Sequence, residues 1–566
     1  MTVSNRQQPL VGMQDCCGLS RRQLIQLASA SAAAGLVAPL TRTAPGVASS
    51  GRTGGNGLYA QDLELVTVTD TSFVLTWYTA GTSTPAAPQI PDAPADPIAT
   101  DGVVRYGTDP GNLDRVAVEW GGETAYHYVE ITGLQPGTTY YYQALSGGVA
   151  ATPRLVPQLS FPPGGSFPPG GLVLPDNPTS GQLEAVLARL VLPGAVQSAS
   201  PGRVTTLVPP PGRLLFTLAL CNDLHAGETV TDLAAANFPP GLFEAPELPP
   251  YPVVMARAMT RDAAARGADV LVVAGDLTAA GRPGQFAASK AVLDRFGTLT
   301  LSGWLGSGDY VVARGSHDQP GTGPEHAACP PVGDAGHHDC LRAVYDLPHG
   351  TLTTTEVAGL RLIGLDTTTL AEPGGAIGGD QFAALAETLA ANPCQPTLVF
   401  GHHPVTDESA STTIGGPSFD LNRADAARLQ QLYAAAPGVF LHHSGRTHRN
   451  LRTRSAVAPD VEFLEVAATK EYPGGFVLLK VYAGGYMVNF YKSSSDLARQ
   501  WSQVSSCQYL GLYPAYTLGT TADRNHVVSR DFSALSALRH RPWWGQRPRS
   551  LRSDAAAVWQ ARPATE

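Results

Sequence analysis

Five short apolar runs between residues 214 and 443 are each followed by aspartate or histidine, and this regularity constrains the fold more than any other feature of the chain. Apolar runs of strand length without polar alternation are typical of strands buried on both faces of a sheet. The carboxyl ends of such strands line the ligand crevice of open α/β sheets, so we expect the residues after the runs to converge. Carboxylates and imidazoles are ligands of divalent zinc, manganese, iron and nickel. The residues concerned are Asp223 and His225, Asp276, His317 and Asp318, His402 and His403, and those of the string LHHSGRTHRN at 441–450.

Helical segments such as ARAMTRDAAARG at 256–267 separate these apolar runs. Alternation of buried strands with helices predicts an α/β domain, which we place at residues 213–494. Its last part, 461–494, contains two or three further strand patterns. Residues 495–566 form a C-terminal extension to which the sequence assigns no role.

Residues 58–152 have a different pattern. The string LELVTVTDTSFVLTWYT at 63–79 alternates by twos and predicts a buried Trp77. Several short strands with turn signals between them favour an all-β sandwich. Residues 153–212 follow as a Pro/Gly-rich linker, because the tandem repeat SFPPGGSFPPGG at 160–171 has no packing pattern.

The N-terminal residues 1–48 resemble a twin-arginine signal peptide. Paired arginines precede an Ala- and Leu-rich stretch in SRRQLIQLASASAAAGLVAPL at 20–40, and small residues follow at 46–50. This predicts export to the extracellular space or the cell envelope. The alternative is an N-terminal anchor helix. No later stretch is apolar enough to predict a membrane span in the mature chain.

The formal net charge is −9, so the chain carries no nucleic-acid-binding signature, and no pattern indicates an oligomeric state.

Cys329 and Cys340 bracket a loop-like segment and predict a disulfide in an exported protein. A zinc site that also uses His337 and His338 is the alternative. We expect three further thiols to be buried: Cys221, Cys394 and Cys507.

The strings that follow the five runs resemble, in order, the blocks D-x-H, G-D, G-N-H-D, H and G-H-x-H of the calcineurin-like metallophosphoesterases. The match spans Asp223 to His448. The resemblance implies a four-layer αββα sandwich and two divalent metal ions bridged by the aspartate of the second block.

Carried over residue by residue, the resemblance implies two ligand sets and one acid. The first ion takes Asp223, His225, Asp276 and His448. The second ion takes Asp276, His402 and whatever stands at positions 316 and 446. His402 fits the ligand position better than His403 because it comes first after the strand. His317 is implied as the general acid or phosphate donor, with Asp318 orienting it.

Two positions depart from this pattern, and both belong to the second ion. Ser316 stands in place of the family's asparagine, and Arg446 in place of a histidine. A hydroxyl can still bind a metal weakly, but a guanidinium stays protonated and cannot. We predict that Arg446 instead holds phosphate oxygens and supplies charge in place of the second ion. The alternative is that Arg446 points to solvent in a decayed site.

His442 and His443 lie on the preceding apolar run, so they alternate faces. We expect one core and one surface histidine. A rescue of the second ion by His443 is the less favoured alternative.

The strings RYGT at 105–108 and GLQPGTTYYYQ at 133–143 resemble the fibronectin-III-like domain that precedes the catalytic domain of purple acid phosphatases. That family has a tyrosine three residues after the bridging aspartate, where this chain has Ala279, and it lacks a histidine at the position of His225. The iron–tyrosinate colour of those enzymes is therefore not expected.

Together these resemblances imply an exported hydrolase of phosphate mono- or diesters, acting through metal-bound hydroxide. It would use one or two divalent ions (manganese, zinc, iron or similar) and a phosphorylated small-molecule or polymer substrate. The alternative is a catalytically degenerate envelope protein that keeps the fold and acts by binding, a view favoured by the departures at 316 and 446.

Overall fold

The computed structural model describes residues 57–81, 97–154, 201–231, 248–333, 336–506, 508 and 513–538, and the backbone of strands β8 (Val156–Leu159) and β9 (Val191–Val196). The twin-arginine segment, the Pro/Gly repeat and Cys507 lie outside these residues. Within them, no helix combines the length and the apolar character needed to cross a membrane.

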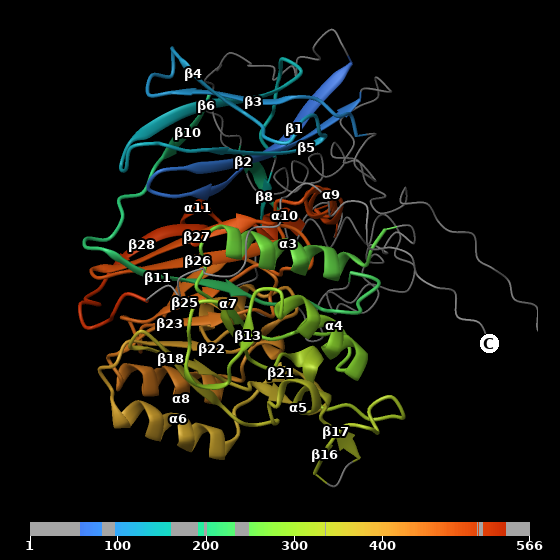
Figure 1. Cartoon of the computed structure of the whole chain (residues 1–566), viewed down its shortest axis with the longest axis vertical. Coiled ribbons are helices and arrows are strands. Elements are labelled where there is room, and N and C mark those ends of the chain that lie inside the picture. The colour runs from blue at the N-terminus through green and yellow to red at the C-terminus, as the bar shows by residue number, and fades with distance from the viewer. Residues whose placement is uncertain are drawn as a thin grey trace, which may run out of the picture.

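The N-terminal part is an all-β sandwich, as predicted (Figure 1). One sheet has the order β1 (Leu58–Val68), β2 (Phe73–Gly81), β5 (Tyr126–Ile131). The other has the order β10 (Gly202–Thr205), β6 (Thr139–Ser146), β3 (Gly102–Gly107), β4 (Arg115–Val118), with β7 (Val149–Ala150) beside β6. Trp77 is buried and stacks on His127, with 4.5 Å between ring centroids. Strand β10 comes from the predicted linker, so residues 202–205 belong to the sandwich.

Two seven-stranded sheets form the centre of the catalytic domain. The first has the order β13 (Thr298–Leu299), β15 (Asp309–Val312), β12 (Val270–Val273), β11 (Leu214–Cys221), β26 (Gly475–Tyr482), β27 (Gly485–Lys492), β28 (Asn525–Ser529). The second has the order β14 (Ser302–Trp304), β18 (Thr353–Val357), β19 (Leu360–Gly364), β22 (Thr397–Phe400), β23 (Val439–Ser444), β25 (Glu462–Glu465), β24 (Leu451–Arg454). Strands β11, β12 and β15 run parallel, as do β19, β22, β23 and β25.

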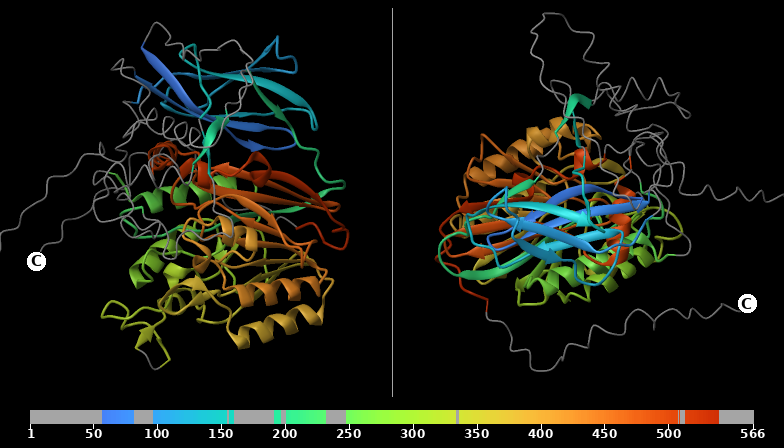
Figure 2. Two further views of the ribbon diagram at one scale, coloured as in Figure 1. Left: turned by 180° about the vertical axis from the view of Figure 1, so that it is seen from behind. Right: turned by 90° about the horizontal axis from the view of Figure 1, so that it is seen from above.

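The two sheets pack face to face, and other elements cover their outer faces. Leu218 and Val272 of the first sheet share one buried cluster with Leu398 and Leu441 of the second. Helices α6 (Gly379–Ala391) and α8 (Arg423–Ala434) cover the second sheet (Figure 2). Helices α3 (Tyr251–Ala265) and α4 (Pro283–Leu293) cover part of the first sheet. The αββα prediction is thus confirmed.

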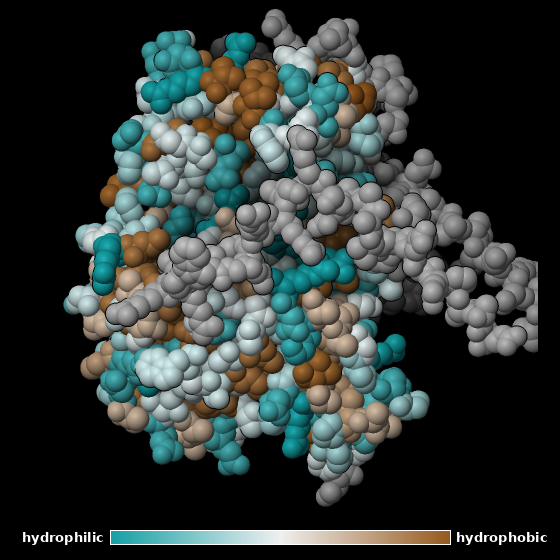
Figure 3. Space-filling model, in the orientation of Figure 1, coloured by the Kyte–Doolittle hydropathy of each residue, from teal (hydrophilic) through white to brown (hydrophobic). Residues whose placement is uncertain are grey.

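The sandwich supplies the rest of the layer over the first sheet. Strand β1 lies along β27, and the Thr67 hydroxyl donates to the Phe490 carbonyl. The predicted C-terminal extension takes part as well: β28 is the edge strand of the first sheet, and the Asn525 side chain accepts from Val68 N at 3.0 Å. On the face drawn in Figure 3, hydrophilic and hydrophobic residues are interspersed over one continuous body.

The cysteine predictions are confirmed in part. Cys329 and Cys340 form a disulfide, so the zinc alternative at this loop is wrong, and His338 lies with Nδ1 2.8 Å from the Cys329 carbonyl oxygen. Cys221 is a buried thiol as predicted. Cys394 is exposed, against prediction, because it lies in the turn between α6 and β22.

Glu64 ties the sandwich to the catalytic domain. Its carboxylate accepts from Lys492 at 2.5 Å and from the Tyr472 hydroxyl at 2.7 Å, and it also pairs with Arg154. Burial alone would raise the pKa of Glu64, but the cations of Lys492 and Arg154 outweigh burial and lower it to about 2. The ionised carboxylate therefore stabilises the contact between the two parts.

Replacing Glu64 with glutamine should lower the free energy of unfolding by about 3–5 kcal/mol, because it leaves the buried Lys492 ammonium without its counter-charge. The folded-state pKa of Glu64 is depressed, so this stabilisation is complete above about pH 4.5 and is lost as the pH falls towards 2. Urea denaturation of both proteins from pH 3 to 7 measures the difference.

Glu130→Gln is the matched control. The Glu130–Arg266 pair also joins the two parts but is more exposed, so its loss should lower the free energy of unfolding by at most about 1 kcal/mol. Equal losses for the two variants would contradict the role given to Glu64.

Candidate metal centre

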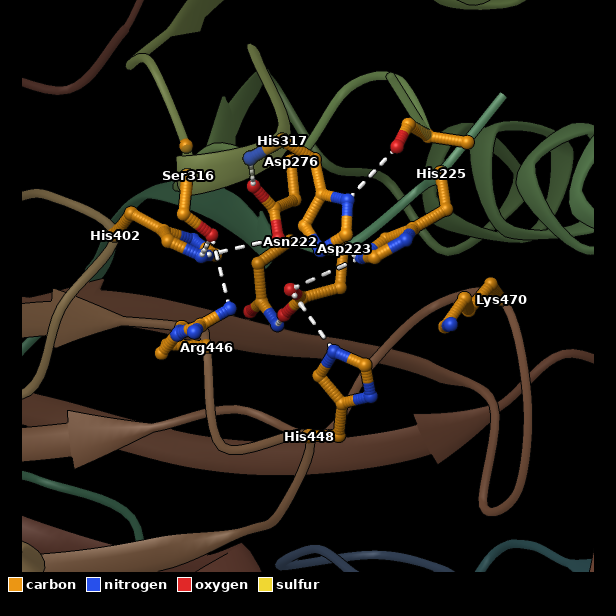
Figure 4. A network of polar contacts seen from close by, with 12 residues as sticks. Asn222, Asp223, His225, Asp276, Ser316, His317, His402, Arg446, His448 and Lys470 are labelled. Carbon is orange, nitrogen blue, oxygen red and sulfur yellow. Dashed lines mark hydrogen bonds and ion pairs between the residues drawn. The ribbon is translucent and has the colours of Figure 1, made fainter. Parts of the chain in front are cut away.

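The structure brings the predicted site residues together where the carboxyl ends of strands from both sheets meet (Figure 4). Strands β11, β12 and β15 deliver residues from the first sheet, and β22 and β23 from the second. The convergence expected from the apolar runs is therefore present. In chain order the residues are Asp223 and His225, Asp276, Ser316 and His317 in the 3₁₀ turn η2 (Ser316–Asp318), His402, Arg446 and His448.

The backbone is strained where these side chains leave it. Asp223, His225, Asp276, Arg446 and His448 all have φ between 46° and 64°. This left-handed region is costly for residues with a Cβ, and such residues persist only where the surrounding structure imposes them. Backbone hydrogen bonds do so here: Asp223 N donates to the Gly275 carbonyl oxygen at 3.0 Å, and His225 N donates to that of Asp276 at 3.0 Å.

Three buried polar atoms without hydrogen-bond partners lie close to one another, with imidazoles and carboxylates of the site within 3.1–3.7 Å. Among the residues that the structure describes, Asp223 Oδ1, His225 Nε2 and Asp276 Oδ2 are buried without a hydrogen-bond partner. Asp223, His225 and His448 each offer a donor atom within 4.8 Å of the others, and so do Asp223, Asp276 and His402, and also His225, Asp276 and His317. Buried polar atoms without partners are costly, and a cation would satisfy them. The donor set therefore fits a divalent metal ion.

The four imidazoles share one arrangement: each Nδ1 lies against a protein acceptor. The Nδ1 distances are 2.7 Å to Glu228 for His225, 3.0 Å to the Ala274 carbonyl oxygen for His402, and 2.8 Å to Glu471 for His448. For His317 the acceptor is the Ala279 carbonyl oxygen at 2.8 Å. This leaves every Nε2 for the centre of the site. Such outer contacts fix the tautomer and orientation of metal-binding histidines.

Sequence reasoning missed the residues that hold two of these histidines. The fully buried Lys470 ammonium lies 2.6 Å from Glu228 and 3.9 Å from Glu471, so it joins both acceptors. Burial alone would lower the pKa of Lys470, but the two carboxylates raise it and keep the ammonium charged. We name this unit, Glu228, Lys470 and Glu471, the outer clamp. The adjacent charges in ATKEYPGG, inside an otherwise apolar stretch, were the available signal.

The central carboxylates are ionised although they are buried. Burial alone would raise the pKa of Asp223, but His448 and His225 lower it well below its usual range. The pKa of Asp276 is shifted in the same direction, burial being outweighed by His402, His317 and His225. The site therefore concentrates negative charge where the unpaired oxygens point.

Arg446 points into the site. Its Nη1 donates to the Ser316 hydroxyl at 2.9 Å, and that hydroxyl lies 3.5 Å from His402 Nε2. The guanidinium stacks 5.0 Å from the centroid of the Phe419 ring and donates from Nε to the Phe419 carbonyl oxygen at 3.4 Å. The alternative of an arginine turned to solvent is contradicted.

Asp318 does not orient the His317 ring. In the described chain its hydrogen bonds come from the backbone N–H groups of Leu277, Thr278 and Gly315 and from the Thr278 hydroxyl, at 2.8–3.0 Å. The predicted orienting role is wrong, because the carboxylate faces the backbone of the loop after Asp276. The Ala279 carbonyl oxygen orients His317 instead. Burial, followed by the charges of His225 and Arg446, lowers the pKa of His317 to about 4, although Asp276 opposes the shift.

The remaining histidines are structural. His442 and His443 are both buried, so the expected surface histidine is wrong: β23 is an inner strand, covered on both faces. His442 contacts the Tyr433 hydroxyl at 2.8 Å, and His443 Nε2 lies 3.2 Å from the Cys221 carbonyl oxygen. None of the candidate metal groups among the described residues includes His443. His403 lies beside His402 and contacts the Thr367 hydroxyl at 2.8 Å.

Comparison with known families agrees with this geometry. Residues 216–434 match the family model of the calcineurin-like phosphoesterases, and residues 60–161 match that of the purple acid phosphatase N-terminal domain. The chain thus carries a calcineurin-like phosphoesterase domain behind a purple acid phosphatase N-terminal domain, and it is a hydrolase that acts on phosphoric ester bonds. The phosphoesterase match ends before β23, the strand that leads to Arg446 and His448.

Solved structures resemble the chain only distantly. A dimetal phosphatase from Danio rerio is 12% identical over 49% of this chain and 96% of its own, with a TM-score of 0.35. A purple acid phosphatase from yellow lupin (Lupinus luteus) seeds is 13% identical over 84% of this chain and 75% of its own, with a TM-score of 0.34. PhoD is 11% identical over 76% of this chain and 85% of its own, with a TM-score of 0.30. These TM-scores are too low to carry an argument. No curated protein matches the chain.

Gly315 lets the loop after β15 pass against Asp276, which gives a direct test of the geometry. A Cβ at Gly315 would lie 2.0 Å from Asp276 N and 2.2 Å from its Oδ1, so Gly315→Ala must displace one of the loops. We expect a loss of at least about 1–3 kcal/mol in the free energy of unfolding. Gly284→Ala in helix α4 is the control, because nothing lies within 4 Å of the place that its Cβ would take, and the stability of this variant should be unchanged or slightly higher. Thermal unfolding of both variants measures the contrast, and an unperturbed Gly315→Ala protein would show that the two loops are not in contact.

Proposed function

We propose that this protein hydrolyses phosphate mono- or diesters at the metal centre formed by the five strand ends. The observation that carries the proposal is the set of buried atoms on Asp223, His225 and Asp276 that face one another without hydrogen-bond partners. Substrates are phosphorylated small molecules or polymers. On the sequence alone, we also propose export by the twin-arginine route to the cell envelope or beyond.

Four residues would hold a divalent ion in the first position: Asp223, His225, Asp276 and His448. Manganese, zinc and iron all suit this mixture of carboxylate and imidazole ligands. When bound, such an ion supplies Lewis-acid chemistry, because it polarises a phosphoryl oxygen and lowers the pKa of a water molecule. The outer clamp keeps the Nε2 atoms of His225 and His448 directed inward.

Arg446 and His317 would act on the phosphate itself. A guanidinium offers a planar fork of donors that matches two phosphoryl oxygens and neutralises charge as it develops. Arg446 is half-buried and is held by Phe419 and Ser316, so its donors are directed before substrate arrives. His317 has Nδ1 committed to the Ala279 carbonyl oxygen, so the proton for the leaving oxygen stands on Nε2 in the imidazolium form, which the lowered pKa makes the minor form near pH 7.

Removal of the metal is the primary test. Purified protein should hydrolyse p-nitrophenyl phosphate or bis(p-nitrophenyl) phosphate, lose this activity with a chelator, and regain it with manganese or zinc. Asp223→Asn should lose both bound metal and turnover, since it removes a charged ligand from the centre. Folded protein that binds no metal and turns over neither ester would instead support the alternative, a degenerate envelope protein that acts by binding.

His317→Ala tests the proton transfer at Nε2. If His317 protonates the leaving oxygen, kcat should fall by about 10²–10⁴-fold for a phenyl or alkyl phosphate. The fall should be much smaller for p-nitrophenyl phosphate, whose leaving group needs no proton. Bound metal should stay at the wild-type level, which separates this effect from damage to the centre. An equal loss of kcat for good and poor leaving groups would exclude the role.

A further inference from the structure

The charges around the centre are unequal. Four carboxylates contact the site imidazoles: Asp223, Asp276 and Glu471, which are buried, and Glu228, which is partly buried. Only two protein cations among the described residues contact this group, Lys470 through the outer clamp and Arg446 through Ser316. Histidines bind metals in their neutral form, so they add no charge in the loaded site. The four carboxylates and two cations together have a net charge of −2. One divalent ion neutralises this charge, whereas two ions would reverse its sign.

The two protein cations lie on opposite sides of the centre. In Figure 4, Lys470 lies beside His225 and His448, whereas Arg446 lies beside Ser316 and His402. The carboxylates of the outer clamp lie between the Lys470 ammonium and the ligand histidines, so the positive charge of Lys470 is already paired. On the other side, Arg446 Nη1 donates a hydrogen bond to Ser316 Oγ, and this oxygen lies 3.5 Å from His402 Nε2.

An ion held by Asp276 and His402 would therefore have the guanidinium as its neighbour. His402 Nε2 lies 3.1 Å from Asp276 Oδ2, and Ser316 Oγ, which accepts from Arg446, lies 3.5 Å from the same His402 Nε2. The positive charge of the neighbouring guanidinium repels a divalent cation at Asp276 and His402. Because the site is buried, solvent screens this repulsion only weakly. A guanidinium does not lose its proton in proteins, so this repulsion persists.

We propose that this centre holds a single divalent ion per chain, bound by Asp223, His225, Asp276 and His448, and that the guanidinium of Arg446 is its permanent second cation. The inference rests on the proposed function and deepens it. Arg446 would hold oxygens of the substrate phosphate through its fork of donors. His402, with Nδ1 fixed on the Ala274 carbonyl oxygen, then keeps its Nε2 3.1 Å from Asp276 Oδ2 and has no metal of its own.

Metal stoichiometry tests the inference without relying on activity. Wild-type protein equilibrated with excess Mn²⁺ and then desalted should contain about one ion per chain by elemental analysis. Its electron paramagnetic resonance spectrum should be that of isolated Mn²⁺ rather than of an exchange-coupled pair.

Arg446→Lys keeps the charge and should stay at one ion. Arg446→Met removes the charge, and Ser316→Asn/Arg446→His also adds two ligands, so bound metal should rise, approaching two ions in the double variant.

The outcomes separate this inference from the proposed function. No metal in folded wild-type protein would overturn both. Two coupled ions in the wild type would overturn the single-ion centre and leave the proposed function standing. A folded double variant that stays at one ion would show that Arg446 is not what excludes the second. Arg423→His, at an exposed position at the start of α8, is the control for adventitious binding by a new histidine and should stay at one ion.

Discussion

The site depends on the way its imidazoles are held through Nδ1. These contacts come from three parts of the fold: a carboxylate after β11, two carbonyl oxygens in the loop between β12 and α4, and a carboxylate before β26. If one acceptor moves, one Nε2 leaves the centre. The outer clamp couples two of them, because a single buried ammonium contacts both Glu228 and Glu471. The ligand geometry is thus imposed by tertiary packing around it.

The sequence predicted the position of the site for a simple physical reason. A strand buried on both faces must be apolar, so its end can be recognised in the sequence as the point where polar residues begin again. Parallel strands then bring those ends to one edge of the sheet. This rule located Asp223, Asp276 and His402 without any knowledge of the fold. It also explains the failure at His442 and His443, which lie within β23, where polar side chains are buried in the sheet interior.

Partner choice could not be predicted in the same way. Asp318 stands next to His317, yet its carboxylate faces backbone N–H groups of the loop after β12. Glu471 accepts from Tyr513 and Gln508, which come from the extension that showed no pattern in the sequence. Such contacts join segments far apart in the chain, and short-range periodicity carries no information about them. The same holds for Glu64, whose partners Tyr472 and Lys492 lie in the other domain.

The support around Arg446 argues that this residue has a function. Its φ of 64° carries a backbone cost that a freely varying surface residue would not need. The neighbouring Arg449 pairs with Glu465 at 2.8 Å and donates to the Thr412 carbonyl oxygen at 2.6 Å, which holds the segment that leads to Phe419. Phe419 in turn contacts the Arg446 guanidinium with both its ring and its carbonyl oxygen. A decayed metal site would lose one ligand, whereas here a cation is fixed in its place by contacts from two loops.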